Sequence, residues 1–307
     1  MAARLNKLSQ SILGIFTVIM LSLNTVIVFI PVFIVGMFKL IPYQPSQKIC
    51  THLLTFLCSR WIDFNTLFIK YSCNIKWHIE NDLTYNYNQW YLVVSNHQSW
   101  LDIVVLQKML HQKVPELKFF VKDQLKWIPV LGFTWWIFDH PFMKRFSKEY
   151  LKKHPEKKGQ DLLATKRSCD KFKNMPVAIM NFIEGTRFTK EKHDKQNSPY
   201  KHLLKPKAGG AAYVLNSLGG KMHSIIDVTI TYPDECSSLW DYVCGRVKHI
   251  GIYAREIKIP EAFLSMNYFD DPVVKLEFQT WLNTLWAEKD ALCAKGLAHY
   301  PLKTKGQ

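Results

Sequence analysis

Apolar and polar positions alternate along the chain in two patterns, which predict an α/β domain behind an apolar N-terminus. Short runs rich in β-branched residues predict strands, and amphipathic stretches between them predict helices. Strands are expected at residues 74–80, 90–95, 118–121, 177–183, 225–232 and 247–257, and helices at 100–112, 160–173, 209–218 and 273–293. The last helix has apolar residues at helical spacing, namely Val274, Phe278, Trp281, Leu282, Leu285 and Trp286. Strands that alternate with helices indicate a mixed, mostly buried sheet flanked by helices.

The N-terminal segment is apolar over an unusual length. Between Lys7 and Lys39, 31 consecutive residues carry no charge, and as one helix they would measure about 46 Å against a hydrocarbon core of about 30 Å. Two arrangements fit: a single tilted span, or a hairpin that dips into one leaflet and turns near Pro31. A cleaved signal peptide is disfavoured because no small-x-small site follows the run. Residues 51–71 are apolar but carry charges, Arg60 and Asp63 among them, which suits an interfacial helix.

Composition adds a strong excess of positive charge. The 307 residues include 40 Lys and Arg against 25 Asp and Glu, a formal charge of +15, which indicates an anionic partner. Two stretches, 139–173 and 187–207, carry local excesses of +6 and +5. An anionic leaflet attracts such residues by about 1 kcal/mol each, and a solvated basic face is the alternative. Nucleic acid is not an expected partner, because no binding motif for it occurs.

The stretch that best indicates chemistry joins a predicted strand to a predicted helix and reads Val93-Val94-Ser95-Asn96-His97-Gln98-Ser99-Trp100-Leu101-Asp102. Side chains five positions apart on one helix point about 140° from each other. His97 and Asp102 can therefore meet only if the histidine lies in the loop and the aspartate in the first helical turn. An imidazole held by a carboxylate is fixed in one tautomer and becomes a stronger base. No G-x-S-x-G nucleophile motif occurs, so the pair suits direct activation of a substrate hydroxyl. The alternative for Asp102 is a capping box with Ser99.

A second motif, Asn181-Phe182-Ile183-Glu184-Gly185-Thr186-Arg187, follows another predicted strand. Arg187 offers a planar fork that matches phosphate oxygens, and Gly185 allows the backbone to approach a ligand closely. The alternative is a surface loop in which Glu184 and Arg187 pair with each other. The motif is thus a candidate phosphate site.

Both motifs, in this order and about 85 residues apart, resemble those of the phospholipid and glycerol-phosphate acyltransferase family. The HQSWLD segment is similar to the H-x4-D block of that family, and FIEGTR is similar to its phosphate-binding E-G-T-R block. The lysophosphatidic acid acyltransferases are the members that the chain resembles most. The resemblance implies a single acyltransferase domain.

Further segments extend the resemblance over residues 93–232. They are 132–138 followed by Lys144-Arg145, 205–210 and 226–229. Beyond this range, residues 281–292 are similar to the branch that contains bacterial inner-membrane members. The fourth block departs from the usual V-P-x-x-P-type pattern, because residues 225–230 read IIDVTI. The headgroup of the acceptor is therefore not implied.

The resemblance also implies a mechanism. His97 would take the proton of an acceptor hydroxyl, and the oxygen would attack the thioester carbonyl of acyl-CoA or acyl carrier protein, while Asp102 orients His97 and balances its charge. The acceptor would be lysophosphatidic acid or a related lyso-phospholipid. Its phosphate would be held by Glu184, Gly185, Thr186 and Arg187, with Lys144, Arg145, Lys205 and Lys207 in support. No metal or other cofactor is needed, because a thioester is already activated.

On this interpretation, residues 1–72 form a membrane-anchoring helical region and residues 73–307 form an acyltransferase catalytic domain with a C-terminal helix. Seven scattered cysteines without a C-x-x-C pair indicate reduced thiols. We therefore expect the catalytic domain on the cytoplasmic side of a bacterial inner membrane, with an anionic membrane surface as a partner. Two other functions fit the same residues: a non-catalytic lipid-binding protein of this fold, and a membrane-tethered hydrolase that activates water.

Overall fold

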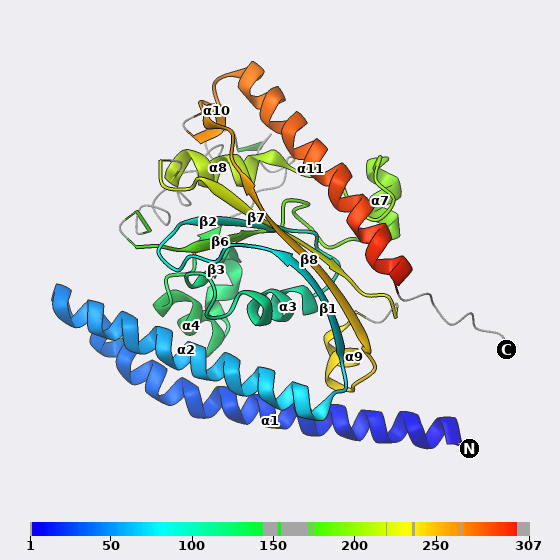
Figure 1. Cartoon of the computed structure of the whole chain (residues 1–307). Coiled ribbons are helices and arrows are strands. Elements are labelled where there is room, and N and C mark those ends of the chain that lie inside the picture. Colours follow the sequence, from blue (N-terminus) through cyan, green and yellow to red (C-terminus); the bar gives the residue numbers. More distant parts are fainter. Residues whose placement is uncertain are drawn as a thin grey trace.

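The chain folds as a six-stranded mixed sheet with helices on both faces and two long helices along one side (Figure 1). The computed structural model describes residues 2–143, 153–154, 172–173, 175–218, 220–234, 237–264 and 266–299. The sheet order is β1-β8-β7-β2-β6-β3. The four strands β7, β2, β6 and β3 are parallel, β8 runs antiparallel to β7, and β1 runs parallel to β8. The predicted α/β class with a mixed sheet is confirmed.

The strands lie close to the predicted ranges. They are β1 (Lys76–Asp82), β2 (Tyr91–Ser95), β3 (Leu117–Phe119), β6 (Ala178–Asn181), β7 (Ser224–Thr231) and β8 (His249–Lys258), with β4 (Val121–Lys122) and β5 (Phe142–Met143) in a separate pair. The strand expected at 118–121 is split, because the chain leaves the main sheet after Phe119. β1 is an edge strand, so Ile79 remains exposed although its neighbours Ile75 and Trp77 pack on the core.

The helices include several that the sequence pattern did not predict. They are α1 (Ala2–Lys39), α2 (Gln44–Ser72), α3 (Leu101–Leu110), the 3-10 helix η1 (Asp123–Trp127), α4 (Leu131–Ile137), α7 (Lys190–Gln196), α8 (Ala208–Leu218), α9 (Leu239–Val243), α10 (Glu261–Leu264) and α11 (Pro272–His299). The helix expected at 160–173 lies outside the described residues, except for its last two. The short helices α4, α7 and α9 contain too few turns for a periodic pattern to be recognised.

Two cores form on the two faces of the sheet because side chains along a strand alternate in direction. Leu92 and Val94 point toward α8 and α11. Tyr91 and Val93 point the other way, toward α3 and α9. The sheet is thus buried on both sides, and the carboxyl ends of its central parallel strands are left for a site.

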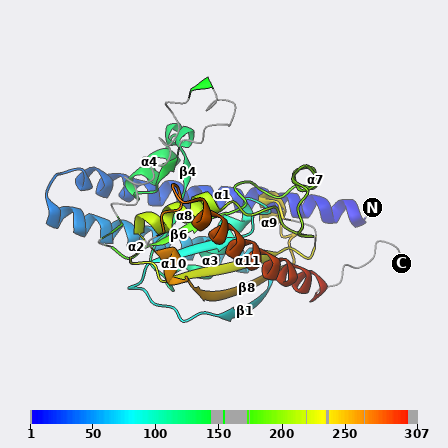
Figure 2. The same cartoon turned by 90° about the horizontal axis from the view of Figure 1, so that it is seen from above.

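The N-terminal helices form an antiparallel hairpin that lies along the α3 side of the sheet (Figures 1 and 2). α1 continues through Pro31, so the alternative of a hairpin that turns near Pro31 is wrong, and the chain reverses at residues 40–43. Within the hairpin, the Asn24 side-chain amide donates to Oδ1 of Asn65 at 2.8 Å. Residues 6–39 are long and apolar enough to cross a membrane, with a mean hydropathy of 2.6 in their most apolar window.

Two glycines of α1 lie close against the rest of the protein. Gly14 leaves no room for a side chain beside Cys244, next to α9, and Gly36 lies against Ile137 of α4. Twenty-two residues separate the two glycines, which corresponds to about 33 Å of helix. α1 therefore runs along the domain and does not project from it.

One lysine lies within the apolar stripe of α11. The stripe is buried as predicted at Phe278, Leu282, Leu285 and Trp286. Lys289 continues the same face and is also fully buried, with Nζ 2.6 Å from Oδ1 of Asp227 and 2.7 Å from the carbonyl oxygen of Val228. Arg255 Nε lies 3.0 Å from the other oxygen of Asp227. A buried acid of the central strand β7 is thus balanced by two cations.

Replacing Lys289 should show how strongly the buried carboxylate of Asp227 destabilises the fold when it lacks this cation. Lys289→Met leaves Asp227 buried with one cation fewer, and we expect a loss of about 3–5 kcal/mol in the free energy of unfolding. The double variant Asp227→Asn/Lys289→Met should recover part of the loss. Thermal and urea unfolding of the three proteins measure both effects, and an unchanged Tm for Lys289→Met would contradict the analysis.

Candidate active site

The candidate site lies where two loops leave the carboxyl ends of neighbouring parallel strands. β2 and β6 pair in a register that sets Val94 beside Asn181, an offset of 87 residues. The same offset separates His97 from Glu184, so the register brings the two motifs together after both strands have ended. The backbone N–H of Phe188 donates to the carbonyl oxygen of His97 at 2.7 Å, which joins the two loops.

His97 lies in the loop after β2, and Asp102 lies in the first turn of α3. Nδ1 of His97 is 2.8 Å from Oδ2 of Asp102. A carboxylate only accepts hydrogen bonds, so the proton lies on Nδ1 and Nε2 is left for a substrate. The same Oδ2 accepts from the backbone N–H groups of Gln98 at 2.6 Å and Ser99 at 2.8 Å, and Oδ1 accepts from the Tyr232 hydroxyl at 2.7 Å. Four donors therefore hold one buried carboxylate.

Asp102 also takes part in the start of α3, so orientation of His97 and helix capping occur together. The bond from Ser99 N–H to Asp102 is the carboxylate half of a capping box. The Ser99 hydroxyl accepts from the N–H of Leu101 at 2.8 Å and donates to the carbonyl oxygen of Ser237. The start of the helix and the histidine thus share one anchor.

The loop after β2, which carries His97, is also held by the end of β7. The Asn96 side chain donates to the carbonyl oxygen of Ile230 and accepts from its N–H, both at 2.9 Å. Burial, with Asp102 beside it, raises the pKa of Tyr232 well above its ordinary value, so the phenol stays a donor. The sequence analysis gave Tyr232 no role. The available signal was its position at the end of a predicted strand.

Aromatic rings flank the reactive side chains. The ring of Phe182 stacks on His97 with centroids 3.8 Å apart and planes 15° apart. The guanidinium of Arg187 lies over the ring of Trp100, with its Cζ 5.0 Å from the centroid. Each stack restricts the orientation of its polar partner. The imidazole of His97 and the guanidinium of Arg187 are thus both fixed by contacts between the loop after β2 and the loop after β6.

Glu184 lies inside the protein and does not belong to a surface loop. Its side chain is 0% exposed, and neither oxygen makes a hydrogen bond of normal geometry with a described residue. Burial raises the pKa of Glu184 to about 8, although the backbone N–H groups of His97 and Leu204 and the charge of Lys289 lower it. The alternative of an exposed ion pair between Glu184 and Arg187 is therefore wrong.

Cations surround the glycine turn that follows Glu184. Gly185 has φ +73°, a left-handed conformation that favours glycine, and a Cβ there would lie 3.5 Å from Nζ of Lys207. Lys192 Nζ donates to the Thr186 hydroxyl at 2.9 Å and to the carbonyl oxygen of Arg187 at 3.0 Å. The arrangement suits an anionic oxygen group. The sequence did not predict a role for Lys192, because its side chain lies beside the glycine turn only once α7 has folded.

The remaining predicted positions lie apart from this turn or outside the structure. Lys205 is exposed, and its backbone N–H donates to Gln196. Lys144 and Arg145 lie outside the described residues. Within the described ranges, no group of three or more His, Cys, Asp or Glu residues could hold a metal ion.

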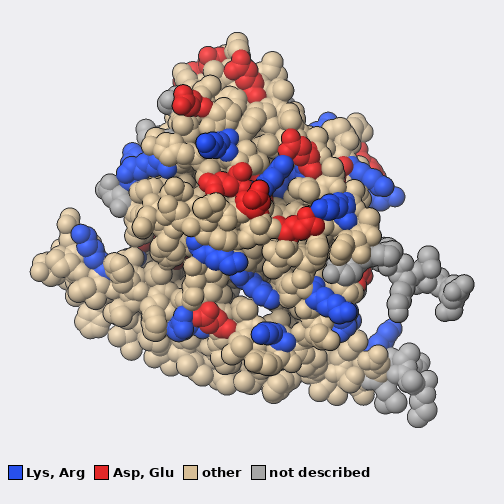
Figure 3. All heavy atoms as spheres, viewed as in Figure 1, with Lys and Arg blue, Asp and Glu red and all other residues tan. Residues whose placement is uncertain are grey.

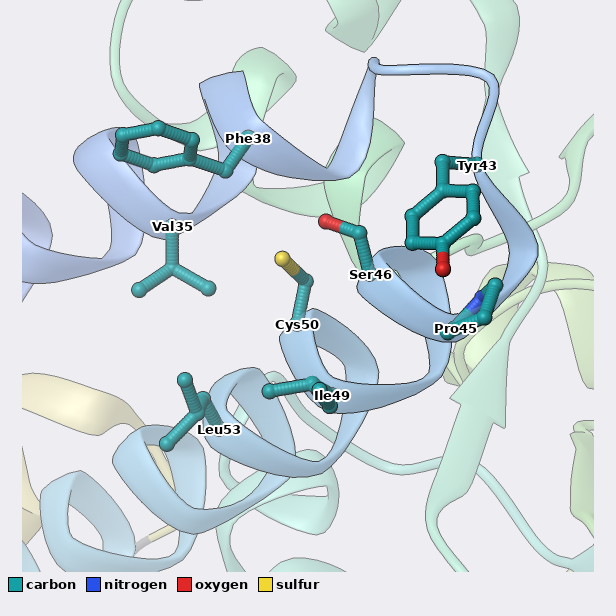
Figure 4. A pocket seen from close by; sticks show the side chains of 8 residues that line it. All are labelled: Val35, Phe38, Tyr43, Pro45, Ser46, Ile49, Cys50 and Leu53. Atoms are coloured by element: carbon teal, nitrogen blue, oxygen red, sulfur yellow. The ribbon is translucent and has the colours of Figure 1, made fainter.

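Two cavities lie in and beneath the hairpin. The first, of about 480 Å³, is open to the surface near the turn between α1 and α2, and Val35, Tyr43 and Leu53 are among the residues that line it (Figure 4). The second, of about 580 Å³, lies between the hairpin and α3, α4 and α9. Neither cavity is lined by His97.

Comparison with known proteins identifies the family. Residues 75–232, half of the chain, match the model of the Acyltransferase family. The chain therefore belongs to the Acyltransferase family.

Individual relatives are distant. The chain is 26% identical over 213 residues to the 1-acyl-sn-glycerol-3-phosphate acyltransferase delta of Homo sapiens, which covers 65% of this chain and 51% of that protein. It is 23% identical over 239 residues to the 2-acyl-1-lysophosphatidylinositol acyltransferase of Saccharomyces cerevisiae, covering 66% of this chain and 60% of that protein. The chain thus spans about half the length of the first of these curated relatives.

A solved structure has a similar fold. The crystal structure of the 1-acyl-sn-glycerophosphate (LPA) acyltransferase, PlsC, from Thermotoga maritima superimposes with a TM-score of 0.51 at 16% sequence identity. The match covers 92% of this chain and 98% of that one, so it includes the hairpin as well as the sheet. At this identity the likeness shows the fold alone.

The buried carboxyl of Glu184 should make stability depend on pH. Its pKa is about 8 in the folded chain against an ordinary value of 4.5. Between these values the unfolded chain loses the proton while the folded chain keeps it, so stability falls as pH rises. Glu184→Gln has no proton to lose at this position, so its stability should not fall with pH in this way. Its Tm should exceed that of wild type by on the order of 5 °C at pH 8.5 and differ little at pH 4.5. A Tm difference that is the same at both pH values would contradict the burial of an ionisable group here.

Proposed function

We propose that the protein transfers a fatty acyl group from an acyl thioester, acyl-CoA or acyl carrier protein, to the free hydroxyl of lysophosphatidic acid or a related lyso-phospholipid. The observation that carries this proposal is the pair of His97 and Asp102, joined at 2.8 Å beside a glycine turn rich in cations. Membership of the Acyltransferase family and the names of the matched relatives support the same reaction.

In the proposed reaction, Nε2 of His97 takes the proton of the acceptor hydroxyl as its oxygen attacks the thioester carbonyl. The carbon–sulfur bond then breaks, and the imidazolium returns the proton to the departing thiolate. Asp102 holds the ring in the tautomer that presents Nε2 and stabilises the imidazolium. A positioned base of this kind contributes about 10²–10⁴-fold in rate.

The phosphate of the acceptor is assigned to the turn after β6. Arg187 offers its planar fork, Lys207 lies beside Gly185, and Lys192 fixes the turn through Thr186. A fully buried carboxyl does not contact a phosphate, so we assign Glu184 to the shape of the loop. Support from Lys144, Arg145 and Lys205 stays a prediction.

Residues 1–72 are assigned to membrane attachment and residues 73–307 to catalysis. The hairpin has an apolar exposed surface, with Ile12, Ile19 and Ile30 each more than half exposed. On the face shown in Figure 3, Lys and Arg side chains follow the boundary between the mostly uncharged hairpin and the sheet, as expected beside anionic headgroups. A bacterial inner membrane stays a prediction, since the curated relatives named above are eukaryotic.

The reaction can be tested with radiolabelled acyl-CoA and lysophosphatidic acid. Wild-type protein should form diacylated product, and His97→Ala should lose about 10²–10⁴-fold in kcat, because the base is gone. The two proteins should have the same Tm. Release of free fatty acid without transfer would indicate a hydrolase, and absence of turnover in both proteins would indicate a non-catalytic lipid-binding protein.

Arg187 should control the affinity for the acceptor. Arg187→Gln removes a charge-assisted contact, so KM for lysophosphatidic acid should rise about 10–100-fold while kcat is largely retained. Lys190→Gln, an exposed cation at the start of α7, is the matched control and should change KM little. Equal effects of the two substitutions would show that only the general positive charge matters.

A further inference from the structure

The segment formed by η1 and α4 exposes large apolar side chains away from the candidate active site. Trp127 is 79% exposed, and Ile128, Val130, Leu131 and Trp136 are each more than a third exposed. Soluble surfaces seldom expose apolar groups in such continuity. We call residues 127–131, which read WIPVL, the apolar tip.

α4, which begins at the end of the apolar tip, is held against α1. The ring of Phe133, in α4, lies 5.2 Å from the ring of Phe33, and Gly36 packs against Ile137. Lys39 Nζ is 2.7 Å from Oδ2 of Asp139 and donates to the carbonyl oxygen of Ile137 at 2.7 Å. These contacts place α4 beside α1 in both views (Figures 1 and 2). The exposed surface of the tip therefore continues the apolar surface of the hairpin.

The backbone of the tip is strained. Val130 has φ +66° and ψ −60°, and the N–H of Leu131 donates to the carbonyl oxygen of Pro129 at 2.7 Å, which closes a tight γ-turn. A β-branched residue in this conformation costs of order 1–3 kcal/mol. Val130 and Leu131 of the turn line the cavity beneath the hairpin but stay more than a third exposed, and Trp127 beside them is 79% exposed. A strained, exposed apolar turn is expected where an outside surface compensates for it.

We propose that the apolar tip inserts into the headgroup region of the same phospholipid leaflet that holds the hairpin, as a second and separate membrane contact. Indole rings prefer this depth. Lys126 extends over the ring of Trp127, with Nζ 5.3 Å from its centroid and 3.0 Å from Oδ1 of Asp123, so the exposed indole lies beside polar groups as it does at a membrane interface. The proposal rests on the proposed membrane attachment of α1 and α2, and it adds a contact made by the catalytic domain itself.

The test uses the full-length protein reconstituted with vesicles of phosphatidylcholine and phosphatidylglycerol, with and without brominated phosphatidylcholine. Emission that Trp127 contributes is obtained by subtracting the spectrum of Trp127→Phe from that of wild type. Trp281→Phe is the matched control, because Trp281 lies on α11, on the opposite face of the sheet. The Trp127 component should lose roughly half of its emission to the brominated lipid, as expected for an indole at headgroup depth, and the Trp281 component should lose none.

Flotation of the same samples separates the tip from the hairpin. If the protein floats with the vesicles and the Trp127 component is not quenched, the tip faces water or another protein, and the proposal is overturned while the hairpin attachment stands. If the protein does not float, both fail. Neither readout depends on acyl transfer, so the proposed reaction is judged separately by turnover in detergent.

Discussion

The buried carboxylate of Asp102 is the constraint on which the site depends. One oxygen accepts hydrogen bonds from the imidazole of His97 and from two backbone N–H groups, and the other accepts from Tyr232 at the end of β7. The strand, the loop and the first turn of α3 are thereby fixed relative to one another. Because both oxygens accept hydrogen bonds, the burial of the charge is compensated and the histidine is held in one tautomer.

Sheet register explains why two distant motifs form one site. β2 and β6 are parallel neighbours, and the offset of 87 residues between them equals that between His97 and Glu184. Both motifs therefore leave the sheet at the same edge, where parallel strands commonly present ligand-binding loops. Beneath this edge lie two further buried charges, Asp227 with Lys289, so the scaffold of the site is electrostatic as well as apolar.

Much of this arrangement could be predicted from local patterns. The strand before His97, the helix that carries Asp102 and the stripe of α11 depend on residues close in sequence, and they lie near the expected ranges. Tyr232 and Lys192 could not be predicted, because their contacts depend on how separate elements pack. Lys289 lies just beyond the predicted stripe, and only the position of Asp227 makes its burial understandable.

The N-terminal region shows how a local rule can mislead. A reversal near Pro31 was one of the two arrangements that the sequence allowed, but one missing N–H bond is tolerated in an apolar helix. The chain turns instead at residues 40–43, between Lys39 and Pro45. The resulting hairpin runs beside α4 and α9 and not away from them. One side of the molecule is therefore apolar over the hairpin and the neighbouring tip, while the basic turn after β6 lies on the edge of the sheet.

The charge of Asp102 can be removed without removing its shape. In Asp102→Asn the amide oxygen can take the place of Oδ2 and accept the same N–H bonds, while the amide nitrogen donates to the oxygen of Tyr232. The most direct measurement is kcat for acyl transfer by this variant at constant Tm. The account predicts a fall of about 10²–10⁴-fold, comparable with the loss of the base itself. A variant that folds normally and keeps the kcat of wild type would contradict it.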